Sequence, residues 1–125
     1  MSISERARAG IVRDMPEQER PISEEYRLVA KAWVDADAAA SLLEETKTAL
    51  LSKLMLDQGE MPVSKAEMNA KASAQWVEYI DAMVTARAEA NLRRVQMKYV
   101  EMRYGEWQSK DANARKERHM GRQAT

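Results

Sequence analysis

The chain of 125 residues is long enough for one domain, and it combines 45% hydrophobic residues with a formal net charge of zero. It has no Cys, which excludes disulfide frameworks and thiolate metal sites and is typical of proteins in a reducing cytoplasm. No apolar run approaches the ~18 residues of a membrane span, and the N-terminus lacks the apolar core of a signal peptide. We therefore expect a cytoplasmic protein without membrane contact.

Residues 1–22 form an N-terminal arm that holds two of the three prolines. Ser4 is a suitable N-cap for a short helix over residues 5–12. A mobile arm without regular structure is an equally good interpretation of the same residues.

A helix is predicted over residues 23–58. Ser23 is a preferred N-cap, and Glu24 and Glu25 put negative charge in the first turn, where the helix dipole favours it. Gly59 and Pro62 then end the helix. Steps of three and four residues give an apolar stripe interrupted only by Lys47, and its members are Tyr26, Val29, Trp33, Ala36, Ala40, Leu43, Lys47, Leu50 and Leu54.

A second helix is predicted over residues 64–108. Ser64 and Glu67 have the spacing of a capping box, and Val63 and Met68 have that of a hydrophobic staple. In one alternative, Gly105 ends this helix. Its stripe is polar only at Arg93 and consists of Ala72, Trp76, Tyr79, Met83, Ala86, Ala90, Arg93, Met97, Val100, Tyr104 and Trp107.

Two helices joined by a loop over residues 57–62 bury their stripes by folding back on each other. The predicted fold is therefore all-α, a long antiparallel helical hairpin of coiled-coil type over residues 23–108, in which Leu43 lies near Tyr79 and residues after Val100 overhang. Apolar residues beside both stripes make them too wide for one partner helix. We expect a homodimer in a four-helix arrangement, with a three-helix monomer that uses residues 4–15 as the alternative. The expected oligomer or partner interface consists of Trp33, Met97, Val100, Tyr104 and Trp107.

Charge is uneven along the chain: residues 1–60 carry 8 basic and 12 acidic side chains, and residues 61–125 carry 12 basic and 8 acidic ones. The tail over residues 109–125 is basic. Cations interleaved with aromatic rings suit single-stranded nucleic acid, because cations neutralise phosphates and rings stack on bases. Cations along a helix also suit a duplex backbone. The predicted nucleic-acid contacts are Arg93, Arg94, Lys98, Arg103, Lys110, Arg115, Lys116 and Arg118.

Catalysis is not expected. The chain has one histidine, His119, and no Cys, so it lacks the usual base–nucleophile pairs, and its isolated glycines form no phosphate-binding loop. Glu78 and Asp81 share a helix face and are the best candidates for a metal site, but an acidic pair of this kind is typical of a solvated surface. We predict no enzyme activity, no cofactor and no metal.

A resemblance lies in the C-terminal region. The runs Trp107-Gln108-Ser109, Ala112-Asn113 and Arg115-Lys116-Glu117, at the end of an Ala- and Glu-rich hairpin, resemble small uncharacterised helical proteins of tailed bacteriophages. Such proteins are often encoded near genes for single-strand annealing, single-strand binding and nuclease proteins. The resemblance covers residues 64–118 and implies an accessory protein of phage DNA recombination or replication.

Two hypotheses of function follow from these observations. In the first, a non-catalytic accessory protein contacts DNA or a DNA-processing enzyme through its basic, aromatic C-terminal region. In the second, a coiled-coil adaptor or inhibitor docks onto a host or phage protein without binding DNA, because the nine Met residues and the surplus of apolar side chains suit varied protein partners.

Overall fold

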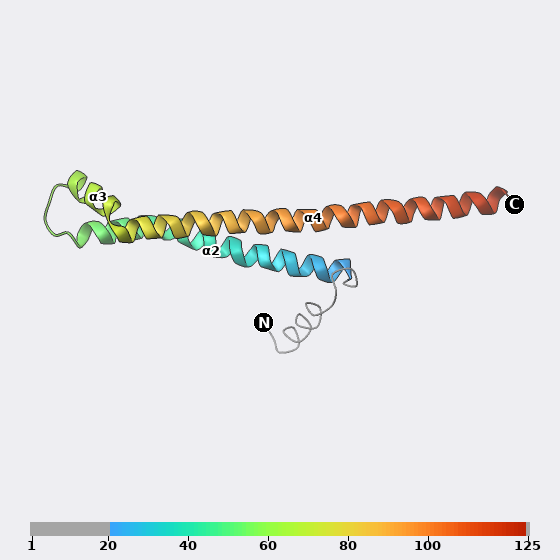
Figure 1. The fold of residues 1–125 in the computed structure, drawn as a ribbon, viewed down its shortest axis with the longest axis horizontal. Helices are drawn as coiled ribbons and strands as arrows, with labels where there is room; N and C mark the ends of the chain where they lie inside the picture. Colours follow the sequence, from blue (N-terminus) through green and yellow to red (C-terminus); the bar gives the residue numbers. More distant parts are fainter. Residues whose placement is uncertain (1–20, 125) are drawn as a thin grey trace, which may run out of the picture. The chain divides into compact units, whose positions relative to one another are not determined.

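The structure is a computed structural model that describes the backbone of residues 21–124 and the side chains of residues 21–121. Three helices make up this part of the chain, which contains no strand: α2 (Ile22–Leu56), α3 (Val63–Ala72) and α4 (Ala74–Ala124) (Figure 1). The all-α prediction is confirmed. The predicted arm, its short helix over residues 5–12 and the three-helix alternative lie outside the described residues.

Helix α2 begins one residue before the predicted start. The backbone N–H groups of Glu24 and Glu25 donate to the carbonyl of Pro21, at 3.1 and 3.0 Å, so Pro21 rather than Ser23 closes the first turn. The two carboxylates lie in the first turn as predicted. The helix ends at Leu56, and Gly59 follows with a φ of 80°, a backbone conformation that glycine adopts without steric cost.

The predicted capping box at the start of the second helix is wrong. Helix α3 begins at Val63 after Pro62, and no side chain caps it. Glu67 instead pairs with Lys71 across one helical turn, at 2.8 Å. The predicted staple does not form either, because Val63 and Met68 are both exposed. The carbonyl of Pro62 accepts from the backbone N–H groups of Lys65 and Ala66, at 3.1 and 3.0 Å, so the first turn starts before Ser64 and leaves this serine inside the helix.

The predicted second helix is instead divided at Ser73. Ser73 has an extended backbone, with φ of −70° and ψ of 148°, and ends α3. Its Oγ accepts a hydrogen bond from the backbone N–H of Trp76 at 3.2 Å, as an N-cap side chain does, and donates one to the carbonyl of Ala70 at 2.6 Å. One serine thus satisfies both helix ends, and the break needs neither glycine nor proline.

Helix α4 continues past Gly105 to Ala124, so the alternative in which Gly105 ends the helix is wrong. The helix also runs through residues 109–124, which the sequence indicated as a tail. A glycine within a helix costs about 1 kcal/mol relative to Ala. This cost is small compared with the favourable helix propensity of the many Ala, Glu, Lys, Arg and Gln residues on both sides of Gly105.

The chain forms two compact units, one over Ala32–Arg93 and one from the segments on either side of it. In the Ala32–Arg93 unit, the core consists of Leu54, Ala70 and Trp76, with Leu50, Leu51, Met55 and Ile80 packed against it. The side-chain amide of Gln58 donates to the carbonyls of Leu54 and Ala66, at 3.2 and 2.8 Å, and so ties the loop over residues 57–62 to α2 and α3.

The predicted stripes are partly buried: five of their twenty positions are buried, ten are half-buried, and the remaining five, which include Tyr26, are exposed. Ala40, Leu54, Trp76, Ala90 and Val100 are each at most 8% exposed. The predicted neighbours Leu43 and Tyr79 do meet, because the Tyr79 hydroxyl donates to the Leu43 carbonyl and also contacts Thr46 Oγ1. Ala72, Tyr104 and Trp107 are the exposed apolar exceptions on α3 and α4, and Lys47 remains exposed with its ammonium 6.0 Å from the Trp76 ring.

Close packing at Ala40 leads to a test of this core. Ala40 is fully buried, whereas its neighbour Ala39 is exposed. Replacing Ala40 with Leu forces extra methyl groups into a filled interface, and we expect the A40L substitution to lower the free energy of unfolding by about 1–3 kcal/mol. The matched A39L variant should stay within about 0.5 kcal/mol of the parent. Urea unfolding followed by circular dichroism measures both, and equal losses in the two variants would contradict the packing.

Candidate interaction site on the C-terminal part of α4

The start of α2 holds the middle of α4 by two polar contacts in the unit that contains both ends of the chain. Arg103 pairs with Glu25 at 2.8 Å, and Glu25 is only 8% exposed. The Tyr26 hydroxyl donates to Glu101 at 3.0 Å, and this hydrogen bond raises the pKa of the Tyr26 phenol above its ordinary value. Contact with α2 therefore extends one turn beyond Val100, where the sequence predicted it to end.

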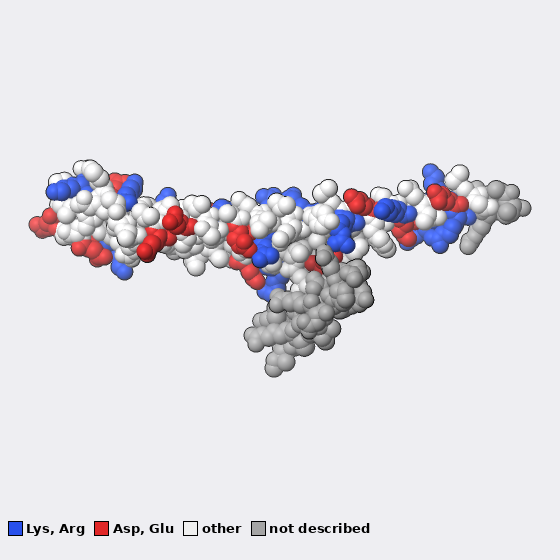
Figure 2. Space-filling view, in the orientation of Figure 1, with Lys and Arg blue, Asp and Glu red and all other residues white. Residues whose placement is uncertain are grey.

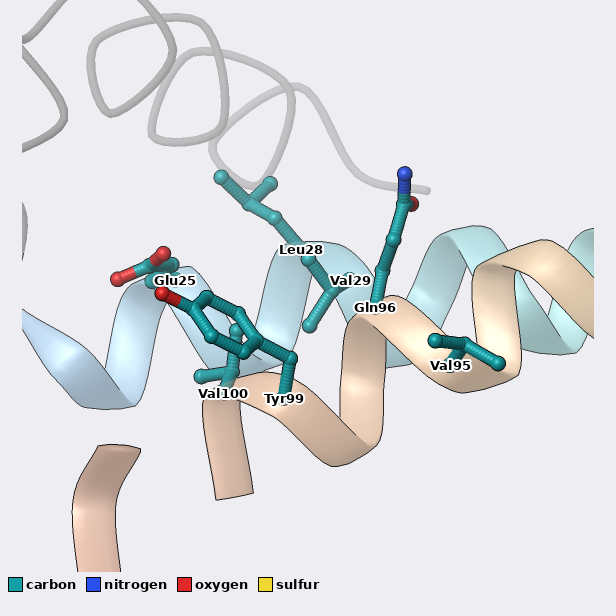
Figure 3. A pocket seen from close by; sticks show the side chains of 7 residues that line it. All are labelled: Glu25, Leu28, Val29, Val95, Gln96, Tyr99 and Val100. Carbon is teal, nitrogen blue, oxygen red and sulfur yellow. The ribbon is translucent and has the colours of Figure 1, made fainter. Parts of the chain in front are cut away.

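A groove of about 570 Å³ lies beside these contacts (Figure 3). Leu28 and Val29 of α2 border it, together with Val95 and Tyr99 of α4. Glu25 stands at the same groove, and its buried Oε2 accepts no hydrogen bond from the described residues. The groove offers apolar walls with one carboxylate oxygen.

A second hollow, of about 350 Å³, lies where α2 starts. It is lined by Ile22, Ser23, Tyr26, Glu101 and Tyr104 and is mostly apolar. Tyr104 is stacked on Trp107, with ring centroids 6.1 Å apart and planes inclined by 19°. Tyr104 is 44% exposed and Trp107 53% exposed.

Gln108 supports this aromatic pair by donating to the Tyr104 hydroxyl at 3.0 Å. Beyond Trp107, every described side chain on α4 is exposed except that of Asp111. The pair and the hollow are therefore the last features of α4 that border another described element.

The predicted interface residues fall into two groups. Val100 is buried within the chain itself, and Trp33 and Met97 are half-buried, so the chain's own packing already uses their surfaces. Tyr104 and Trp107 remain open to a partner.

The predicted nucleic-acid contacts are also divided. Several already have partners within the chain: Arg93 with Glu89, Arg103 with Glu25, Arg115 with Asp111, and Arg118 with the carbonyl of Ala114. Among the predicted contacts, the four exposed cations for which the described residues provide no ion pair are Arg94, Lys98, Lys110 and Lys116.

The cations do not share one side of the helix. At 100° per residue, Lys98 and Lys116 point the same way, whereas Lys110 points about 120° from them and Arg118 about 160° from them. Figure 2 shows acidic and basic side chains interspersed along the visible face, including over the C-terminal part of α4. The structure thus brings the aromatic pair together and leaves the cations scattered.

Glu78 and Asp81, the candidate metal pair, are both exposed on α4. Among the described residues, no three His, Cys, Asp or Glu side chains gather where they could hold a metal. His119 lies on the exposed C-terminal part of α4. No described helix contains a stretch long and apolar enough to cross a bilayer.

An ion cluster in the Ala32–Arg93 unit was not predicted. Arg87 binds Asp37 at 2.7 Å and Glu44 at 3.1 Å, and it also donates to the Ser41 hydroxyl. Asp37 and Glu44 are seven residues apart on α2 and therefore share a face of the helix. This spacing is visible in the sequence and could have indicated the acidic half of the cluster.

Comparisons of the chain with protein-family models, with curated proteins and with solved structures found no match.

The Arg87 cluster makes stability depend on pH. Hydrogen bonds from Arg87 hold the pKa of the Glu44 carboxyl below its ordinary value of 4.5. A carboxyl with a lowered pKa in the folded state stabilises the protein above its ordinary pKa, and the stabilisation disappears as the pH falls through the folded-state value. The E44Q variant should therefore have a lower melting temperature than the parent at pH 7, and this difference should vanish at pH 2.

Exposed Glu45, next in sequence, provides the control: E45Q should leave the melting temperature nearly unchanged at pH 7. Differential scanning calorimetry at a series of pH values from 7 to 2 measures the melting temperatures of the parent and both variants. An E44Q deficit that persists at pH 2 would contradict the role given to the ion pair.

Proposed function

We propose that the protein is a non-catalytic helical interaction protein in which α2 and α4 form an antiparallel hairpin and the C-terminal part of α4 binds a partner protein. Contacts within each unit support the hairpin, because early residues of α2 meet late residues of α4. Tyr26 bonds to Glu101 in one unit, and Leu43 bonds to Tyr79 in the other. A homodimer in a four-helix arrangement, in the cytoplasm, belongs to the same proposal.

The single observation that carries this proposal is the exposed Tyr104–Trp107 stack beside the apolar hollow at the start of α2. Aromatic side chains are enriched at protein–protein interfaces, where they supply large contact areas and few rotatable bonds. The hollow is open and apolar, so it suits an aliphatic or aromatic side chain of a partner. The intramolecular pairing of Arg103 and Arg115 lowers the charge available for phosphates.

Affinity capture with matched variants tests the protein-binding function. The full chain should recover one stoichiometric partner from a bacterial or phage-infected lysate, and recovery should survive nuclease treatment. The double variant Tyr104→Ala with Trp107→Ala should reduce recovery at least about tenfold, since losing one central aromatic anchor costs about 2 kcal/mol or more.

The control variant Val63→Ala with Met68→Ala removes two exposed apolar side chains from α3 instead, at 71% and 70% exposure, and should bind as the parent does. Equal recovery by both double variants would remove the aromatic pair from the proposed site.

The second candidate function is that of a phage accessory protein of DNA recombination or replication that contacts DNA. Its specific support is the exposure of Tyr104 and Trp107 near the exposed Lys110, which follows Trp107 by three residues on α4, since aromatic faces stack on unpaired bases and cations neutralise phosphates. The resemblance of residues 107–117 to small phage proteins gives the cellular setting.

Fluorescence anisotropy with labelled single-stranded and duplex DNA separates the two functions. If DNA is the partner, single strands bind at about 50 mM salt and lose affinity steeply by about 200 mM, because phosphate contacts release counterions. Trp107→Ala should then weaken binding to single strands more than to duplex. If protein is the partner, neither DNA binds at the lower salt concentration.

A further inference from the structure

A second apolar face runs along α4, separate from the stripe that packs inside the chain. It comprises eight positions separated by three or four residues, and only one of them is polar: Val77, Asp81, Val84, Ala88, Leu92, Val95, Tyr99 and Met102. We call this set the outer stripe. At 100° per residue the eight positions fall within an arc of about 80°.

The outer stripe lies on the side of α4 opposite to the buried stripe. Trp76, Ala90 and Val100 are buried on the inner side, at 7%, 1% and 4% exposure. The six large apolar side chains of the outer stripe are between 50% and 66% exposed, and Asp81 and Ala88 are exposed as well. Arg103 lies 5.9 Å from the centroid of the Tyr99 ring, and Val95 and Tyr99 border the groove beside α2, but all eight side chains of the stripe remain exposed. An apolar row of this length is unusual on a monomer.

The identity of its occupant follows from the order of the side chains. Counted from its first and from its last position, the outer stripe has the same spacing to within one residue, so each position meets another stripe position in an antiparallel pair. When a second copy lies antiparallel, Val77 meets Met102 and Val84 meets Val95. Ala88 then meets Leu92, which pairs a small side chain with a large one. A two-fold symmetric interface requires a self-complementary face of this kind, in which residue i of one copy contacts residue j of the other and j contacts i.

Asp81, the single polar member, decides between orientations. In the antiparallel register it lies opposite Tyr99 of the second copy, next to Lys98, so a phenol hydroxyl and an ammonium can donate to its carboxylate. In a parallel pair, Asp81 faces Asp81, and two like charges repel in an apolar layer. Charge complementarity therefore selects the antiparallel pair.

A like-charge pair also falls at the edge of this register, where Arg87 approaches Arg94 of the second copy. Arg87 is already bound by Asp37 and Glu44, so its charge is compensated within its own chain. The edge thus adds little repulsion to an interface whose centre is apolar.

We infer that the outer stripe of α4 is the surface on which two copies of this chain associate, antiparallel, with the two-fold axis between residues 89 and 90. This inference rests on the homodimer in the proposed function and adds the face and the register. The predicted interface at Trp33, Met97 and Val100 lies instead on the inner side or in the chain's own packing.

Light scattering on the full chain gives the first test. The parent should have twice the mass of one chain at micromolar concentration. V84E or V95E should shift the protein to monomer by raising the dissociation constant of the dimer at least 100-fold. The control V34E places the same charge at a valine of α2 that is 55% exposed, and it should stay dimeric. A monomeric parent overturns both the homodimer and the inference, whereas a dimer unaffected by V84E and V95E overturns the inference alone.

Cysteine cross-linking tests the register, since the natural chain has no Cys. Mixed under mild oxidation, the single variants V84C and V95C should form a disulfide-linked heterodimer, and each variant alone should remain uncross-linked. A parallel pair gives the reverse result, cross-linking of each variant with itself, and would overturn the antiparallel register. Circular dichroism of each variant establishes that the helices are retained.

Discussion

Close packing of small side chains along the inner face of the helices is the constraint on which the Ala32–Arg93 unit depends. Ala40, Ala66, Ala70 and Ala90 are at most 5% exposed, while the bulky Trp76 fills the space beside Leu54. Alanine lets helix backbones approach closely, and it has the highest helix propensity of the amino acids. The same residues therefore set the secondary structure and the distance at which its elements pack.

The stripe of α2 and most of that of α4 could be predicted from spacing alone, because a long helix with an apolar face leaves a strong periodic signal. The loop over residues 57–62 was equally clear from Gly59 and Pro62. The break at Ser73 was not, since a serine between two alanines carries no breaker signal and acts only through hydrogen bonds to Ala70 and Trp76. At the C-terminal end the error ran the other way: the predicted helix ended at residue 108, or at Gly105 in the alternative, whereas α4 continues to Ala124. A single weak residue does not end a helix whose neighbours favour it.

The candidate site was predictable as a region and less so as an arrangement. Spacing identified Tyr104 and Trp107, yet it gave no hint that they stack on each other beside a hollow at the start of α2. Composition indicated a basic surface, but geometry scatters its cations and pairs several within the chain. Helix α4 thus has two kinds of surface: its inner face packs with the chain, and its outer face and C-terminal part are exposed.

Hydrogen exchange read by mass spectrometry tests the central claim most directly, which is that inner-face burial, rather than helix propensity alone, stabilises α4. Amides over residues 76–100 should exchange far more slowly than those over residues 105–121, because only the first segment has tertiary contacts that must break before its backbone opens. Equal protection of the two segments in the isolated protein would contradict the account.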